Sequence, residues 1–81
     1  MYIEFSLPNG AGGMAAGHAA SALRREIEKW ATKYEIPYRT KIHKYTFRVC
    51  LDSDEQYTFF QLSWDPQSEY FRSYRFIKTE Q

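Results

Sequence analysis

Basic and aromatic side chains alternate in one stretch of the sequence, and their spacing would suit a polyanion. No acidic residue occurs between Ile36 and Leu51. The basic residues there are Arg39, Lys41, His43, Lys44 and Arg48, interleaved with Tyr38, Tyr45 and Phe47. In an extended chain Arg39, Lys41 and His43 share one face at roughly 6.5 to 7 Å, close to the phosphate repeat of a single nucleic-acid strand. Because nearby rings could stack bases, the stretch predicts a surface for single-stranded RNA or DNA.

The same residues also have a purely structural interpretation. Lysine and arginine on an edge strand protect a sheet against edge-to-edge aggregation, and their stems cover apolar surface. The formal net charge is only +1 at pH 7, and the sequence carries no RNP1-type motif. These observations favour the structural interpretation, so nucleic acid stays the second hypothesis for the partner.

A glycine-rich loop, residues 9–13, stands between a predicted strand and a predicted helix. Free backbone amides and the positive end of the helix dipole could bind an anion there, with Asn9, Gly10, Gly12 and Gly13 as candidate residues. However, Ala15 stands where the dinucleotide fingerprint needs glycine, and no lysine follows as in a P-loop. A flexible turn is therefore favoured, and a phosphate or nucleotide ligand is the third hypothesis.

Residues for catalysis or metal binding are sparse. His18 and His43 are the two histidines, and neither has a histidine or cysteine neighbour at metal-ligand spacing. The single cysteine, Cys50, is flanked by Val49 and Leu51 and is favoured as an inert strand residue. Because Arg48 is two positions away and would lie on the same strand face, a reactive thiol beside this cation stays an alternative. We therefore predict no catalytic residue, no metal and no cofactor, and favour a role other than an enzyme.

Length and composition limit the class of protein. The chain has 81 residues, enough for a single globular domain over residues 1–81. Hydrophobic residues make up 43% and charged residues 26%, which predicts a packed core rather than disorder. No segment approaches the roughly 20 apolar residues of a membrane span, and no signal peptide is evident. With one cysteine, the chain is expected to be cytoplasmic, without a membrane partner.

Two elements are predicted in the first half of the chain. Residues 2–7 alternate between apolar and polar, which is typical of a half-buried strand that Pro8 ends. From residue 14 to 34 apolar side chains recur at spacings of three and four, as on one face of a helix. They are Ala16, Ala20, Leu23, Ile27, Trp30 and Tyr34. Pro37 should end this helix near Glu35.

Three strands are predicted in the second half, over residues 37–51, 57–64 and 70–78. In the first of these, the apolar residues switch from one strand face to the other near His43, which indicates a bend or bulge there. Polar residues 52–56 and 65–68 are expected as turns, with 52–56 closing a hairpin. The order β-α-β-β-β predicts an α+β fold, with one long helix on one face of a small, mostly antiparallel four-stranded sheet.

One helix covers only one face of such a sheet, whereas aromatic residues occur at both parities of the last two predicted strands. Tyr57, Phe59, Tyr74 and Phe76 are the candidate interface residues. An exposed aromatic surface of this kind marks protein interfaces, and symmetric self-association is the commonest form. The leading hypothesis is a non-catalytic interaction module that binds another protein, or a second copy of itself as a homo-oligomer, through the uncovered sheet face or edge.

Overall fold

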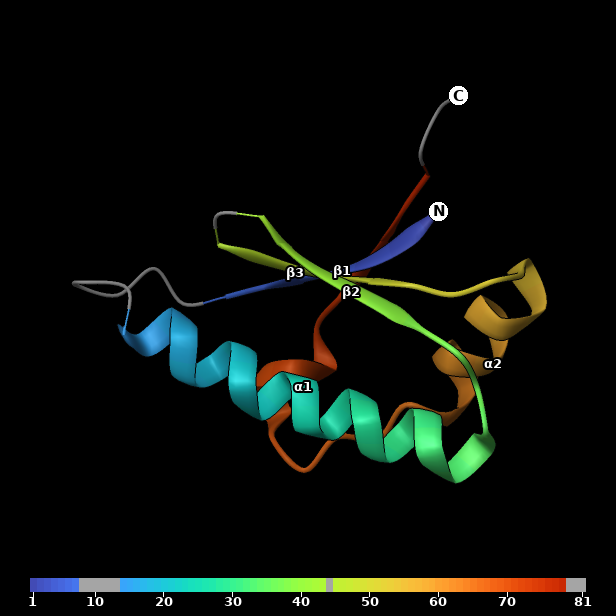
Figure 1. Cartoon of the computed structure of the whole chain (residues 1–81), viewed down its shortest axis with the longest axis horizontal. Coiled ribbons are helices and arrows are strands. Elements are labelled where there is room, and N and C mark those ends of the chain that lie inside the picture. Colours follow the sequence, from blue (N-terminus) through green and yellow to red (C-terminus); the bar gives the residue numbers. More distant parts are fainter. Residues whose placement is uncertain (8–13, 44, 79–81) are drawn as a thin grey trace.

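The computed structural model of the chain describes residues 1–7, 14–43 and 45–78. Its elements are β1 (Tyr2–Ser6), α1 (Met14–Tyr34), β2 (Arg39–His43), β3 (Thr46–Cys50), α2 (Asp54–Ser63), the 3-10 helix η2 (Glu69–Arg72) and β4 (Arg75–Ile77). The strands form one antiparallel sheet in the order β2-β3-β1-β4. Figure 1 shows α1 and α2 on the same side of this sheet. The α+β class and the four-stranded antiparallel sheet are thus confirmed, with two helices rather than one.

The topology explains why both described helices lie on one face of the sheet. Strands β1 and β2 both run antiparallel to β3, which lies between them, so β1 and β2 are parallel to each other. Helix α1 makes the crossover between them, and α2 precedes β4, which adds to the other side of β1. This β-α-β-β-α-β order with a split parallel pair places both helices on one layer.

Helix α1 spans the predicted residues and ends where predicted. Leu23 and Ile27 are fully buried, and Trp30 is nearly so. At the C-terminus Glu35 adopts a positive φ of 56°, and the Ile36 N–H donates to the Ala31 carbonyl at 2.9 Å. These are the features of a Schellman end, in which a left-handed residue lets the chain satisfy the last carbonyls of the helix. The chain leaves α1 at this point toward β2.

The strand predicted over 37–51 is in fact two strands, β2 and β3. The chain reverses between His43 and Thr46, and the Thr46 hydroxyl donates to the His43 carbonyl at 2.7 Å. Ile42 then pairs with Phe47, so the two side chains share a face although their sequence parity differs. The uneven parity therefore reflects a reversal of the chain and not a bend within one strand.

The strand predicted over 57–64 is wrong, because residues 57–63 belong to helix α2 and Trp64 is its C-cap. Ser53 is the N-cap, and its hydroxyl accepts from the Gln56 N–H at 3.3 Å. The Gln56 side chain reaches back to accept from the Asp52 N–H at 2.8 Å. This is a variant of the S-x-x-Q capping box, which satisfies free N–H groups at a helix start. Residues 52–56 consequently begin a helix instead of closing a hairpin.

The strand predicted over 70–78 is only partly formed. Residues 69–72 make the 3-10 helix η2, which Ser68 caps by accepting from the Tyr70 N–H at 3.3 Å. Phe71 is buried, and its carbonyl accepts from the Trp64 indole N–H at 2.9 Å. Of residues 70–78, only Arg75–Ile77 pair with β1. The capped η2 and the buried Phe71 hold residues 69–72 away from the sheet.

The core lies between the helix layer and the inner sheet face. The strands contribute Ile3, Phe5, Phe47 and Val49, the residue after β1 contributes Leu7, and the two helices contribute Leu23, Ile27, Trp30, Tyr57 and Phe60. The ring of Phe60 lies at its centre, 4.9 Å from Trp64, 5.0 Å from Trp30 and 5.2 Å from Tyr74 between centroids. Leu23 and Trp30, which lie on the predicted apolar face of the helix, are buried, whereas Leu62 on α2 is 81% exposed. Aromatic residues at odd and at even positions of the sequence therefore pack in the same core.

Candidate functional site

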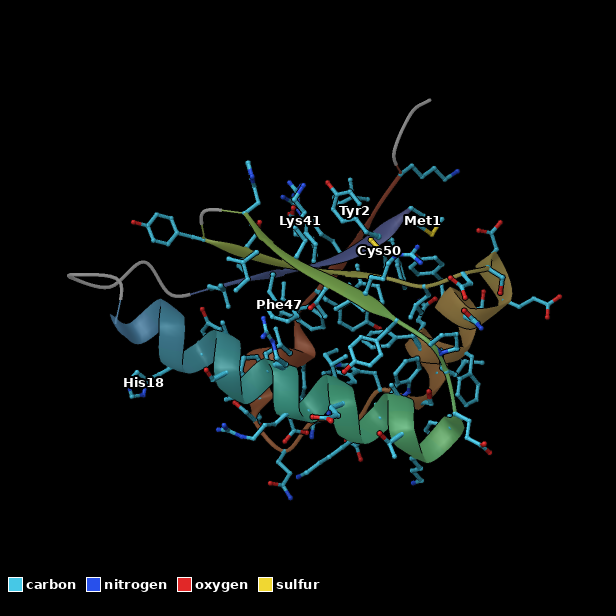
Figure 2. The ribbon with its side chains drawn as sticks, in the orientation of Figure 1. Met1, Tyr2, His18, Lys41, Phe47 and Cys50 are labelled. Atoms are coloured by element: carbon cyan, nitrogen blue, oxygen red, sulfur yellow. The ribbon has the colours of Figure 1, made fainter. Side chains whose placement is uncertain are left out.

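The candidate site is the sheet face opposite both described helices (Figure 1), called here the open face. Directly opposed residues in antiparallel strands point to the same side, so the register identifies its members. They are Arg39, Lys41 and His43 on β2, Thr46, Arg48 and Cys50 on β3, Tyr2, Glu4 and Ser6 on β1, and Arg75 and Ile77 on β4. In Figure 2 the side chains of Lys41 and Tyr2 project away from α1, whereas Phe47 points toward it.

One row of charged residues crosses all four strands of the open face. Lys41 is opposite Arg48, Arg48 is opposite Glu4, and Glu4 is opposite Arg75. Since neighbouring strands lie about 4.8 Å apart, this row is roughly 15 Å long. Arg39 adds a further cation two residues along β2. Within the described strands Glu4 is the sole acidic side chain on this face, so the face is positively charged.

Glu4 lies beneath the arginines and orients them. Glu4 is only 6% exposed, and its Oε1 accepts hydrogen bonds from the Nε of Arg75 at 2.9 Å and from the Nη2 of Arg75 at 2.6 Å. Its Oε2 is 3.6 Å from the Nε of Arg48. A guanidinium has five N–H donors, and the side chain of Arg75 is 72% exposed. Arg75 therefore keeps donors for a ligand while the buried carboxylate fixes its position.

Tyr2 and Arg48 pack against each other at the middle of the face. The guanidinium carbon of Arg48 lies 4.7 Å from the centre of the Tyr2 ring, which is a cation–π contact. Tyr2 is half-buried on β1, and the Arg48 side chain is 26% exposed on β3. A planar ring and a planar cation are thus held together on the two central strands.

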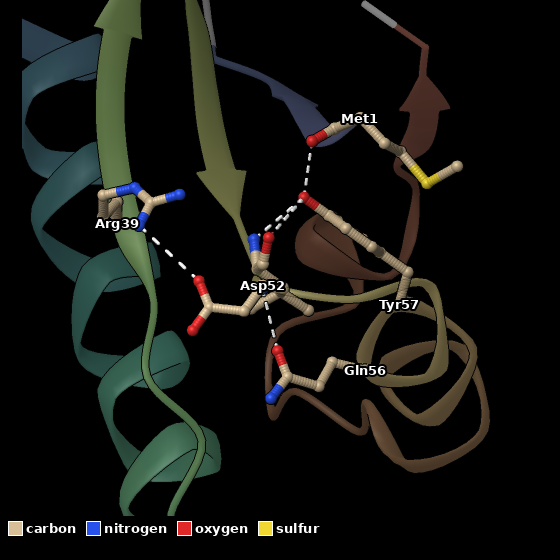
Figure 3. Close-up of polar contacts among 6 residues, drawn as sticks. Met1, Arg39, Asp52, Gln56 and Tyr57 are labelled. Carbon is tan, nitrogen blue, oxygen red and sulfur yellow. Dashed lines mark hydrogen bonds and ion pairs between the residues drawn. The ribbon is translucent and has the colours of Figure 1, made fainter.

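The rim of the open face near β2 is tied to α2 by polar contacts, shown in Figure 3. An ion pair joins Arg39 to Asp52, with 3.6 Å between Nη1 and Oδ1. The Tyr57 hydroxyl accepts from the Leu51 N–H at 2.8 Å and donates to the Met1 carbonyl. Burial raises the pKa of Tyr57, and its hydrogen bond to Leu51 partly opposes that shift. Tyr57 therefore fastens the start of α2 to two strand ends.

The structure brings together most of the predicted nucleic-acid residues. Arg39, Lys41, His43 and Arg48 all lie on the open face. Lys44 lies outside the described residues, as do the four candidate anion-binding residues of the glycine-rich loop, Asn9, Gly10, Gly12 and Gly13. Tyr2, Glu4 and Arg75 were not predicted as site residues. The alternation of residues 2–7 does place Tyr2 and Glu4 on the polar side of a strand, but only the register shows their neighbours.

The four predicted interface residues do not lie on the open face. Tyr57 is buried in α2, and Phe59 is 37% exposed on the helix layer, with its ring centroid 4.8 Å from that of Tyr34. Tyr74 packs 5.7 Å from Phe5 between centroids. Phe76 is opposite Ile3, which places it on the inner face. The uncovered surface is therefore lined by cations where the sequence predicted aromatic rings.

Other reactive side chains are dispersed. His18 is exposed on α1, in the other layer from His43 on β2. Cys50 is half-buried and lies opposite Arg39. Within residues 1–7, 14–43 and 45–78, no group of three or more His, Cys, Asp and Glu side chains is placed to hold a metal ion. Nor does any described helix have the length and apolar character needed to cross a membrane.

Comparisons with known proteins add no functional information to this geometry. No family model, no curated protein and no solved structure matches the chain. The function is therefore inferred from the residues of the open face and from their arrangement.

Proposed function

We propose that this chain binds single-stranded nucleic acid on the open face of its sheet. The observation that carries the proposal is the charged row together with Arg39, which gathers cations from β2, β3 and β4 on one uncovered surface. Lys and Arg that neutralise phosphates release condensed counterions, and this release supplies most of the sequence-independent affinity for nucleic acid. Lys41, Arg48, Arg75 and Arg39 outnumber the two carboxylates that pair with the arginines, Glu4 and Asp52, and this surplus of positive charge supports a polyanionic ligand.

The shape of the surface favours a single strand over a duplex. The charged row crosses the sheet from β2 to β4 over roughly 15 Å, which is long enough to contact more than one phosphate of an extended strand lying across it. Proteins that read duplexes usually insert a helix or a two-stranded ribbon into a groove. Both helices here lie on the other layer, and the open face is a sheet surface. Such a surface lets an unpaired strand lie across it with its bases accessible for stacking.

The test is a binding titration with a matched charge control. A fluorescein-labelled, mixed-sequence oligonucleotide is titrated by anisotropy with the wild type and with Arg39→Ala/Lys41→Ala, at several salt concentrations. Arg25→Ala/Lys29→Ala removes the same charge from exposed positions of α1. We expect tight binding at low salt, and a salt slope reduced by about 1.4 in the open-face variant, since each phosphate contact on a single strand contributes about 0.7.

Three results would contradict this proposal. The first is an absence of binding by the wild type at low salt. The second is an equal loss of affinity in the two double variants, because net charge alone would then decide binding. The third is tighter binding of a duplex of the same sequence than of the single strand. Circular dichroism of each variant shows whether the fold is retained.

A second candidate function is binding to another protein, or self-association, through the edge strand β2. Strand β2 ends the sheet, and two large apolar residues lie exposed at or beside it, Ile42 at 47% and Tyr45 at 46%. An added strand could pair with this edge and cover both side chains. Light scattering during size exclusion tests self-association. A dimer that Ile42→Ser weakens would support it, and a monomer at high micromolar concentration would exclude the homodimer.

A further inference from the structure

We infer that Tyr2 and Arg48 form a stacking site for one unpaired base, so that the ligand is recognised by its bases as well as by its phosphates. This inference rests on the proposed function of the open face. It names the part of the nucleic acid that the centre of the face contacts, whereas the cations alone would accept any extended polyanion.

The position of the pair on the sheet supports a base between two phosphates. Tyr2 and Arg48 lie on the central strands β1 and β3, whereas Lys41 lies on the edge strand β2 and Arg75 on the edge strand β4. A strand that crosses the sheet would meet a cation, then the planar pair, then a second cation. Aromatic rings and guanidinium planes are the groups on which unpaired bases stack in nucleic-acid complexes.

The environment of Arg48 is costly if the residue has only a structural role. Its Nε is buried and has no hydrogen-bond partner among the described residues, although it lies 3.6 Å from the Glu4 carboxylate. A buried ion pair seldom stabilises a fold more than apolar residues of similar volume. The carboxylate and the Tyr2 ring instead hold the guanidinium in a fixed orientation. That preorganisation is useful for a planar ligand, because less side-chain entropy is lost on binding.

The experiment compares ligands of equal length and charge that differ in their bases. Oligothymidylate and an abasic oligomer with the same phosphodiester backbone are titrated with the wild type, Tyr2→Ala and Tyr2→Phe. Tyr34→Ala serves as the control, because Tyr34 is a partly exposed tyrosine on the helix layer. We expect the wild type to bind oligothymidylate about 5- to 150-fold more tightly than the abasic oligomer, the range that one stacked base provides.

The variants then separate stacking from a structural role of Tyr2. Tyr2→Ala should bind oligothymidylate as weakly as the abasic oligomer and leave abasic binding unchanged, whereas Tyr2→Phe and Tyr34→Ala should keep the preference for bases. Equal affinity of the wild type for both oligomers would overturn the stacking site while leaving a phosphate-binding face. A Tyr2→Ala variant that loses both ligands equally would also overturn it, because the ring would then only support the fold. Failure of both oligomers to bind the wild type would overturn the proposed function itself.

Discussion

Replacing Phe60 with alanine should destabilise the protein far more than replacing Leu62, which lies two positions further along α2. Phe60 is fully buried, and its ring lies 4.9 Å from Trp64 and 5.0 Å from Trp30 between centroids. Leu62 is 81% exposed. In a helix the two side chains are about 200° apart around the axis, so only one can face the core.

The expected costs follow from this difference in burial. Truncation of a buried phenylalanine to alanine costs about 3 to 5 kcal/mol, because transfer energy is lost and a cavity remains. A chain of 81 residues has a free energy of unfolding of only about 4 to 12 kcal/mol. Phe60→Ala should therefore lose at least about a quarter of this free energy, and all of it where the wild-type value lies at the low end of the range. Leu62→Ala should change stability by no more than about 0.5 kcal/mol, since an exposed leucine is replaced by the best helix former.

Urea unfolding followed by far-ultraviolet circular dichroism measures both costs. With a slope of about 1 kcal/mol per molar urea, the Phe60→Ala midpoint should fall by about 3 to 5 M or the folded baseline should be lost. The Leu62→Ala midpoint should stay near that of the wild type. If residues 57–64 were a strand, Phe60 and Leu62 would share a face and both truncations would be costly. A Leu62→Ala cost similar to that of Phe60→Ala would thus refute helix α2.

Three further expectations concern polar contacts. Ser53→Ala should lower stability by about 1 kcal/mol in thermal melts, because the Gln56 N–H loses its cap, whereas the exposed Thr58→Ala on the same helix should not. Glu4→Ala should cost about 1 to 3 kcal/mol in urea, since the Arg48 guanidinium loses its carboxylate; a cost below 0.5 kcal/mol would be inconsistent with a central role for Glu4. Because burial raises the pKa of Tyr57, its contribution to stability is complete below about pH 10 and is lost as the pH rises through the folded-state pKa. Tyr57→Phe should cost about 1 to 3 kcal/mol at neutral pH and make stability fall less steeply in alkaline titrations; an unchanged alkaline slope would contradict this.

Helix α1 and strand β1 could be predicted because the apolar residues of each segment repeat at the spacing of a helix or of a strand. The spacing of Leu23, Ile27 and Trp30 fits one helix face, and these residues are buried as expected. Helix α2 was missed because Tyr57 and Phe60, three positions apart on one helix face, also fit an alternating aromatic strand. The S-x-x-Q sequence beginning at Ser53 is the local signal that could have distinguished the two. The reversal after His43 has no glycine, proline or asparagine to announce it.

The candidate site could be predicted only where its residues are close in sequence. Arg39 and Lys41 share a face in any extended chain, so their common direction follows from the strand period. The contact of Glu4 with Arg75 joins residues 71 positions apart and depends on the register of β1 with β4. No local pattern specifies which strands become neighbours. The basic residues of β2 and β3 could thus be predicted to share a face. The position of the Glu4 carboxylate and the contact of Tyr2 with Arg48 could not be predicted without the register of the sheet.

The pairing of β1 with β4 has a consequence for how this fold assembles. Tyr2 is opposite Ile77, so the central strand of the sheet completes its pairing only with residues from the far end of the described chain. The β2–β3 hairpin is the only strand pair of the described sheet that forms between sequence neighbours. Contacts of such long sequence separation slow folding, because a large loop must close before the contact is gained. Arg75 belongs to β4, so the charged row is complete only once β4 has been synthesised and has paired with β1.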